Sequence, residues 1–142
     1  MNIYFWIPVG ILLGLLAAAM FKRYKMIKNL EVTPNSDKLV ELTDGNFKKV
    51  IQKGVTLVDF WAPWCMPCKI QGPVVNELAD LMHEKATISK LNIDDNKRVA
   101  GELGIRSIPT IIIFKNGKPV KKLVGVKSLN VLKKSVLEVL AD

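Results

Sequence analysis

Apolar and charged residues are distributed in two different ways along this chain. Residues 2–21 carry no charged side chain, whereas from Asp37 onward short apolar runs alternate with charged residues. A helix that crosses the hydrocarbon core of a bilayer needs about 20 apolar residues. The pattern therefore predicts one N-terminal membrane-spanning helix, followed by a separate globular domain over residues 37–142.

The pattern from residue 37 onward predicts alternating strands and helices. Apolar runs rich in β-branched residues indicate buried strands, and apolar residues at helical spacing indicate amphipathic helices. The Asn116-Gly117 pair between the last two apolar runs indicates a hairpin. We expect an α/β domain in which helices cover both faces of one sheet. The expected strands are residues 39–42, 55–60, 87–93, 110–114 and 120–124, and the expected helices are residues 47–52, 65–83, 97–103 and 128–140.

The N-terminal apolar segment fits either an uncleaved membrane anchor or a cleaved signal peptide. Ala17-Ala18-Ala19 fits a cleavage site. Signal peptides typically carry Lys or Arg before the apolar run, and this chain carries none there. The basic residues Lys22, Arg23, Lys25 and Lys28 follow it instead, and by the positive-inside rule they favour the cytoplasm for all that follows. We expect a single-pass anchor over residues 1–21, inserted through residues 3–21 with the N-terminus outside. An extracytoplasmic domain is the alternative.

Residues 22–36 join the expected anchor to the expected domain. This segment is basic at its start, ends in Thr33-Pro34-Asn35-Ser36 and shows no clear apolar periodicity. Pro, Asn and Ser are typical of turns and loops. We therefore expect a basic juxtamembrane linker that acts as a tether.

The net charge of +8 does not by itself indicate a nucleic-acid-binding protein. Residues 37–142 carry 17 Lys and Arg against 12 Asp and Glu, and the basic residues are scattered. A nucleic-acid-binding surface normally shows clustered basic residues with aromatic residues between them. We therefore expect no nucleic-acid partner.

The only two cysteines, Cys65 and Cys68, form one Cys-x-x-Cys motif between a predicted strand and a predicted helix. A helix N-terminus offers unpaired N–H groups and the positive end of the macrodipole, which favour a thiolate at Cys65. The thiolate is the nucleophile of thiol–disulfide exchange. Cys68 lies nearly one helical turn later, so its sulfur falls beside that of Cys65. We expect Cys65 to attack a substrate disulfide and Cys68 to resolve the mixed disulfide.

The two cysteines could serve three purposes other than redox chemistry. A structural disulfide would close a very small loop and add little stability by chain entropy. A tetrahedral zinc site needs about two more ligands, and the only histidine, His83, lies at the far end of the same predicted helix, so we expect no metal. Buried, unreactive cysteines do not explain the flanking Pro63 and Trp64 in the turn from strand to helix. The context favours redox chemistry.

Four sequence blocks resemble the thioredoxin family. Residues 58–69, Val-Asp-Phe-Trp-Ala-Pro-Trp-Cys-Met-Pro-Cys-Lys, look like the active-site stretch of thioredoxins, and residues 90–94, 104–110 and 114–117 match later family motifs in the same order. The resemblance covers residues 37–142. It implies a thioredoxin fold with a central mixed β-sheet flanked by helices. It also implies a protein-disulfide reductase that uses the Cys65–Cys68 disulfide and no other cofactor.

The resemblance implies roles for four residues outside the motif. Asp59 matches an acid that is buried under the second cysteine and helps to move its proton, and Lys90 matches the lysine beside that acid. Burial raises the pKa of a carboxyl and a nearby ammonium lowers it, so the net pKa of Asp59 stays open. Pro109 matches a cis proline packed against the dithiol. Ile108 would present its backbone to an extended substrate segment.

The residues next to the cysteines are expected to contact the substrate. Trp64 would supply part of the apolar surround of a groove. Most thioredoxins carry Gly-Pro between the cysteines, whereas this chain carries Met66-Pro67. Pro67 should still stiffen the turn, while Met66 adds apolar bulk and leaves the redox potential open.

The chain as a whole is therefore expected to be a membrane-tethered thioredoxin that reduces disulfide-containing proteins. Thioredoxin reductase or another thiol donor would re-reduce it. One alternative is an extracytoplasmic enzyme that reduces exported protein or apocytochrome thiols. The other is a non-catalytic scaffold, which would not need Cys65, Cys68, Asp59 and Pro109 together.

Overall fold

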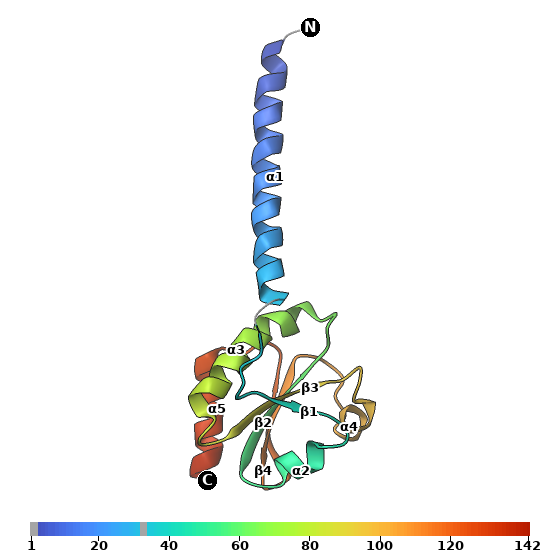
Figure 1. Cartoon of the computed structure of the whole chain (residues 1–142), viewed down its shortest axis with the longest axis vertical. Helices are drawn as coiled ribbons and strands as arrows, with labels where there is room; N and C mark the ends of the chain where they lie inside the picture. Colours follow the sequence, from blue (N-terminus) through green and yellow to red (C-terminus); the bar gives the residue numbers. More distant parts are fainter. Residues whose placement is uncertain (1–2, 32–33) are drawn as a thin grey trace. The chain divides into compact units, whose positions relative to one another are not determined.

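The computed structural model describes residues 3–31 and 34–142 and shows two compact units, Met1–Thr33 and Pro34–Asp142 (Figure 1). Residues 1–2 of the expected anchor and 32–33 of the expected linker lie outside the described residues. The first unit is a single helix, α1 (Ile3–Glu31). The second unit contains the sheet and the remaining helices.

The helix α1 is apolar and its described side chains are not buried. The stretch Ile7–Lys25 comprises 19 residues with a mean hydropathy of 1.5, which is long and apolar enough to cross a membrane. A signal sequence near the N-terminus has the same length and apolar composition. Large exposed apolar side chains on this stretch include Ile7, Ile11, Leu12, Leu13, Leu15, Leu16, Met20 and Phe21.

The first part of the expected linker is helical, which corrects the prediction of an irregular tether. α1 does not end at Phe21 but continues to Glu31. The reason is composition, because residues 22–31 contain neither Gly nor Pro and are rich in Lys, Met, Leu and other good helix formers. The next helix-breaking residue is Pro34.

The last residues of the expected linker pack on the domain. Asn76 accepts a hydrogen bond from the backbone N–H of Ser36 at 3.4 Å and donates one to the carbonyl of Pro34 at 3.5 Å. The Ser36 hydroxyl also bonds the Asp80 carboxylate. Residues 34–36 are therefore held on the globular unit, which begins before Asp37.

A mixed five-stranded sheet forms the centre of the second unit, in the order β1-β3-β2-β4-β5. The first three strands of this order are parallel, and β4 and β5 are antiparallel to their neighbours. The strands are β1 (Val40–Leu42), β2 (Val55–Trp61), β3 (Thr87–Asn92), β4 (Thr110–Lys115) and β5 (Lys118–Val124). This arrangement confirms the mixed sheet that the resemblance implied.

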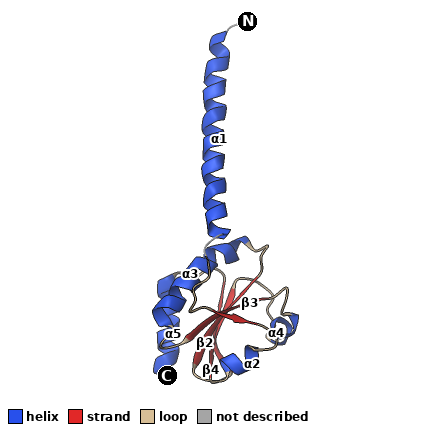
Figure 2. Ribbon diagram, viewed as in Figure 1, coloured by secondary structure: helices blue, strands red, loops and turns tan. Residues whose placement is uncertain are grey.

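Helices cover both faces of the sheet, as predicted (Figure 2). α3 (Met66–Met82) and α5 (Leu129–Ala141) lie on one side, and α2 (Phe47–Ile51) and α4 (Lys97–Glu102) lie on the other. The hairpin between β4 and β5 turns at Asn116 and Gly117, whose φ angles are 49° and 83°. Positive φ at both central residues is the signature of a type I′ turn, which explains the Asn-Gly pair.

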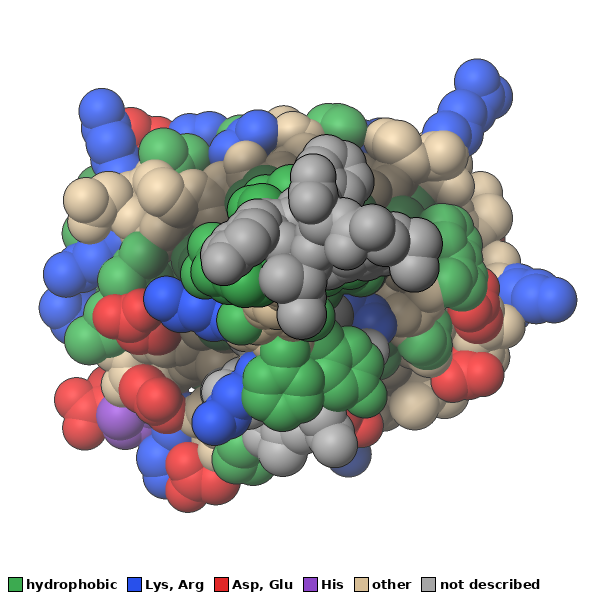
Figure 3. All heavy atoms as spheres, turned by 90° about the horizontal axis from the view of Figure 1, so that it is seen from above, with side chains coloured by type: hydrophobic (Ala, Val, Ile, Leu, Met, Phe, Trp, Pro, Cys, Tyr) green, Lys and Arg blue, Asp and Glu red, His purple; other side chains and the backbone are tan. Residues whose placement is uncertain are grey.

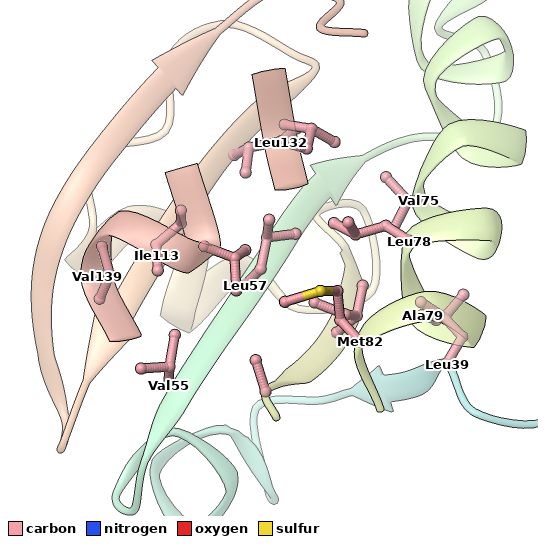
Figure 4. Close-up of a cluster of buried hydrophobic side chains, with 14 residues drawn as sticks. Leu39, Val55, Leu57, Val75, Leu78, Ala79, Met82, Ile113, Leu132 and Val139 are labelled. Carbon is pink, nitrogen blue, oxygen red and sulfur yellow. The ribbon is translucent and has the colours of Figure 1, made fainter. Parts of the chain in front are cut away.

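Two hydrophobic cores separate the sheet from its helices. The core under α3 and α5 contains Leu57 of β2 together with Leu78, Ile113 and Leu132 (Figure 4). The core under α2 and α4 contains Val58 and Phe60 together with Phe114. Successive strand residues point to opposite faces. Asp59, between Val58 and Phe60, therefore faces the same side as Leu57, where α3 carries the cysteines.

Candidate active site

The two cysteines lie at the carboxyl end of the central strand. β2 ends at Trp61, and α3 begins at Met66 after a short turn. Cys65 is the N-cap residue of α3 and is disulfide-bonded to Cys68. Both cysteines are buried and pack with Ala62, Trp61, Ile93 and Ile108.

The helix N-terminus directs a hydrogen-bond donor at the Cys65 sulfur. The Cys65 Sγ accepts a hydrogen bond from the backbone N–H of Cys68 at 3.2 Å. When the disulfide is reduced, the same N–H and the helix dipole stabilise a thiolate at Cys65. Pro67 lies in the first turn, where a missing N–H leaves no helical hydrogen bond unmade. This geometry favours Cys65 as the nucleophile.

The structure brings Ile108 and Pro109 beside the disulfide. The peptide bond between them is cis, and the Ile108 carbonyl oxygen lies 3.7 Å from Cys65 Sγ. Pro109 is buried, and its carbonyl accepts a hydrogen bond from Gly125 N–H at 2.9 Å. The segment before β4 and the segment after β5 thus meet at the end of the sheet that carries the disulfide.

Trp64 is fixed by a residue that the sequence reasoning missed. Its side chain is 68% exposed, and its indole N–H donates to the Asp94 carboxylate at 3.0 Å. Asp94 follows β3, which runs parallel to β2, so the carboxyl ends of both strands share one edge of the sheet. Its place in the block of residues 90–94 was the available signal.

Exposed apolar side chains are found on the segments around the buried disulfide. Met66 is exposed on the first turn of α3, and Ile70 is exposed one turn later. Val126 is exposed on the segment after β5. Apolar surface of this kind suits the binding of an unfolded or extended protein segment.

Gln71 is a second functional candidate that the sequence reasoning missed. It is completely buried on α3 and bonds the backbone of Lys127 through both its amide nitrogen and its amide oxygen. The signal was weak, because a Gln at this helical spacing is the only polar member among the buried residues of α3 apart from Cys68. A buried polar group needs such partners to offset its loss of water.

Asp59 is a buried carboxyl without a hydrogen bond on one of its oxygens. Among the described residues, Asp59 Oδ1 has no hydrogen-bond partner. Burial raises the pKa of Asp59 from 3.8 to about 7, although the positive charge of Lys90 lowers it. Desolvation is therefore the larger effect, which resolves the question that the sequence left open. A carboxyl that titrates near neutral pH can both accept and release a proton there.

Lys90 lies beside Asp59 but bonds elsewhere. The two residues are register partners on neighbouring strands. The Lys90 ammonium forms an ion pair with Glu41 Oε1 at 3.2 Å and lies 5.1 Å from the centroid of the Trp61 ring. Within the described ranges, no ion pair joins Lys90 to Asp59. Glu41 had not been identified from the sequence.

The sequence predicted neither a metal site nor a nucleic-acid-binding surface. Over residues 3–31 and 34–142, no group of three or more His, Cys, Asp and Glu side chains is arranged to hold a metal ion. His83 is exposed at the end of α3, where its ring nitrogen bonds the Asp80 carbonyl. On the face shown in Figure 3, Lys and Arg side chains are spread among Asp and Glu rather than gathered in one patch.

The arrangement is suited to thiol–disulfide exchange. One sulfur is activated at a helix N-terminus, a second lies in bonding distance, and a titratable carboxyl lies on the sheet face below the same helix. A backbone carbonyl and exposed apolar side chains border the pair. An attacking sulfur and a second sulfur beside it are the groups that thiol–disulfide exchange requires.

Comparisons with known proteins agree with this chemistry. The thioredoxin family profile matches residues 38–138. A thioredoxin of Alicyclobacillus acidocaldarius is 46% identical over 100 residues, covering 70% of this chain and 95% of the relative. Thioredoxin 2 of Chlorobaculum tepidum is 50% identical over 105 residues, covering 72% and 96%. A solved structure of a mutant thioredoxin from Halobacterium salinarum aligns with a TM-score of 0.67 and 30% identity, covering 75% of this chain and 94% of that one.

The matches extend over the sheet, the disulfide helix and the segment before β4, which are the parts that build the site. They support protein-disulfide reductase activity, as the cysteine geometry does. The N-terminal helix precedes the matched region. Because the family profile matches residues 38–138 and the two relatives are 46% and 50% identical, the chain belongs to the thioredoxin family.

Proposed function

We propose that this protein is a membrane-tethered thioredoxin that reduces disulfides of cytoplasmic proteins. The observation that carries the catalytic half is the disulfide at the N-terminus of α3, with the Cys65 sulfur bonded by a backbone N–H. The observation that supports the tether is the unburied apolar surface of α1.

The reaction begins from the dithiol form. The Cys65 thiolate attacks one sulfur of a substrate disulfide, and the other substrate sulfur leaves as a thiolate that takes up a proton. The mixed disulfide between Cys65 and the substrate is then attacked by the Cys68 thiolate. The Cys65–Cys68 disulfide forms, and the second substrate sulfur leaves as a thiol. Two electrons have passed from the protein to the substrate.

Asp59 is proposed to accept the proton that Cys68 must lose before its attack. Its carboxyl is buried on the sheet face covered by α3, and its pKa of about 7 leaves a substantial fraction ionised at neutral pH. The unpartnered Oδ1 provides the acceptor. Lys90 is proposed to assist by its positive charge, which favours the ionised form of Asp59.

The substrate is proposed to bind along the segment that precedes β4. The backbone of Ile108 would pair with an extended substrate strand beside the cis Pro109. Trp64, Met66 and Pro67 would contact its side chains next to the disulfide. Thioredoxin reductase or another thiol donor would then return the site to the dithiol form, with no further cofactor.

The tether is supported by the free-energy cost of exposing the apolar side chains of α1 to water. Exposed apolar side chains along α1 would be unfavourable in water, and a bilayer of about 30 Å matches the length of such a helix. The basic residues directly after the apolar run favour a cytoplasmic domain with the N-terminus outside. An extracytoplasmic domain that reduces exported or apocytochrome thiols is the competing assignment, and a cleaved signal sequence would remove the tether.

Insulin reduction by the full-length protein in detergent tests the catalytic half. We expect the wild type to accelerate precipitation of the insulin B chain with dithiothreitol as donor, and Cys65→Ser to show only the rate of dithiothreitol alone. Equal rates for the two proteins would support the scaffold alternative and overturn the enzymatic proposal.

Thiol labelling in intact cells tests the tether and its orientation. A Cys65→Ser/Cys68→Ser protein with Glu102→Cys carries one reporter thiol on an exposed position of α4. We expect a membrane-impermeant maleimide to label it only after lysis, with the full-length protein in the membrane fraction. Labelling of intact cells would place the domain outside, and a shortened soluble product would show cleavage.

A further inference from the structure

Three charged residues form a row across the parallel part of the sheet. Glu41 on β1 is the register partner of Lys90 on β3, and Lys90 is the register partner of Asp59 on β2. Register partners on neighbouring strands project to the same face and lie about 4.8 Å apart. The ammonium of Lys90 therefore has a carboxylate on either side, one at the edge strand and one at the central strand.

The ammonium of Lys90 bonds the carboxylate at the edge strand. Its distance to Glu41 Oε1 is 3.2 Å, while Asp59 Oδ1 has no hydrogen-bond partner among the described residues. The Lys90 side chain is 16% exposed and that of Glu41 is 67% exposed. Glu41 thus keeps most of its hydration, whereas pairing Lys90 with the buried Asp59 would require a desolvated ion pair.

A second donor holds the Glu41 carboxylate in place. The side-chain amide of Asn35 donates to the same oxygen, Glu41 Oε1, at 3.1 Å. Asn35 lies between Pro34 and Ser36, which are themselves bonded to Asn76 on α3. The Glu41 oxygen that pairs with Lys90 is therefore fixed from both the sheet and the start of the domain.

We propose that Glu41 is a positioning residue of the active site. Its carboxylate holds the Lys90 ammonium toward the edge strand β1 and away from Asp59. This inference rests on the proposed role of Asp59 as the proton acceptor of Cys68. Glu41 does not touch the reacting sulfurs and acts only through Lys90.

The position of Lys90 controls how readily Asp59 ionises. On β4 the register partner of Asp59 is the apolar Ile111. The buried residues of α3 and α5 contribute no charged side chain, and Cys68 among them is held in the disulfide. A movement of the Lys90 ammonium, which Glu41 holds, would thus change the pKa of Asp59. A nearer ammonium would lower the pKa of Asp59 further below the value that burial sets.

The first test is carboxyl NMR titration of Asp59 in the full-length, oxidised protein. Glu41→Gln keeps the shape of the side chain and removes its charge. We expect Lys90 to move toward Asp59 and the proton affinity of Asp59 to fall roughly two- to fivefold. This range corresponds to the interaction energies of exposed ion pairs. The low-pH limb of the insulin-reduction profile should move in the same direction. Glu102→Gln breaks an ion pair of similar exposure, 52%, on α4 and should change neither.

A double-mutant cycle tests whether Glu41 acts through Lys90. Lys90→Met should raise the pKa of Asp59, opposite to Glu41→Gln. Adding Glu41→Gln to Lys90→Met should then produce no further shift. An unchanged Asp59 titration in Glu41→Gln, or the same shift with and without Lys90, would overturn the proposal.

The proposed proton-accepting role can fail separately. Asp59→Asn with wild-type activity across the pH range would remove that role. The NMR titration of Asp59 would still report whether Glu41 controls Lys90.

Discussion

The side-chain amide of Gln71 bonds the backbone of a single residue, Lys127, in both directions. Gln71 Oε1 accepts from Lys127 N–H at 2.7 Å, and Gln71 Nε2 donates to the Lys127 carbonyl at 3.2 Å. Gln71 lies about one turn after Cys68 on α3, and Lys127 lies in the segment between β5 and α5. Gly125 in the same segment bonds the carbonyl of Pro109, which lies beside the disulfide. Gln71 therefore links the cysteine helix to the segment that supports Pro109.

Replacing Gln71 by Met should weaken both the fold and substrate binding. The change leaves the Lys127 N–H and carbonyl without their partners. An unsatisfied buried group costs about 1–3 kcal/mol, and these half-buried groups should cost less. We expect a lower urea midpoint and a higher KM for insulin, with kcat changed less. Ser135→Ala, a buried polar substitution on α5, should leave KM unchanged. Wild-type KM in Gln71→Met would contradict the proposed contribution of this segment to binding.

Asp59→Asn should stabilise the protein at neutral and alkaline pH. The pKa of Asp59 is raised from 3.8 to about 7 in the folded state, so folding favours the protonated carboxyl. Its favourable contribution is complete below pH 3.8 and is lost as pH rises through 7. Between these values wild-type stability should lose about 1.4 kcal/mol per pH unit relative to the variant.

Urea denaturation of the oxidised protein at pH 4, 6 and 8 measures this difference. We expect the gap in unfolding free energy between Asp59→Asn and the wild type to widen from pH 4 to pH 8. A gap independent of pH would show that Asp59 does not titrate in this range.

Cys68→Ser should trap the reaction half-way. Cys65 can still attack a substrate disulfide, but no second sulfur is available to release the substrate. We expect a mixed disulfide to accumulate, visible as a higher-mass band on non-reducing gels and removed by dithiothreitol. Cys65→Ser should form none, and a trapped product with Cys65→Ser instead would reverse the assigned roles.

Asp94→Ala should loosen Trp64 without unfolding the domain. The substitution removes the acceptor of the indole N–H at 3.0 Å, a hydrogen bond worth about 1 kcal/mol. We expect KM for insulin to rise roughly fivefold, since 1.4 kcal/mol corresponds to tenfold. The neighbouring Asp95 bonds Asn92 rather than Trp64, so Asp95→Ala is the matched control. Equal KM in both variants would show that the Trp64 contact does not affect binding.

Local sequence patterns were sufficient for most of the secondary structure. The mainly apolar run at 55–60, rich in β-branched residues, corresponds to β2 (Val55–Trp61), because a strand buried on both faces carries mostly apolar residues. Asn116-Gly117 identified the hairpin because few other residues adopt its positive φ angles. The error at the linker arose because Pro34, not the loss of apolar residues after Phe21, sets the next break in helical propensity.

The sequence alone determined the chemistry of the motif, since Cys65 and Cys68 lie within one helical turn and their spacing is local. The family resemblance also predicted roles for Asp59, Lys90 and Pro109. Only the tertiary structure decided that burial outweighs Lys90 at Asp59, because desolvation depends on every element packed around the carboxyl.

Tertiary structure likewise decided the partners of two candidate site residues. Lys90 bonds Glu41 and Gln71 bonds Lys127, and both pairs are distant in sequence. Such pairings follow from strand register and helix docking, which no local periodicity encodes. The reaction type is thus a property of a short segment, while its tuning is a property of the whole fold.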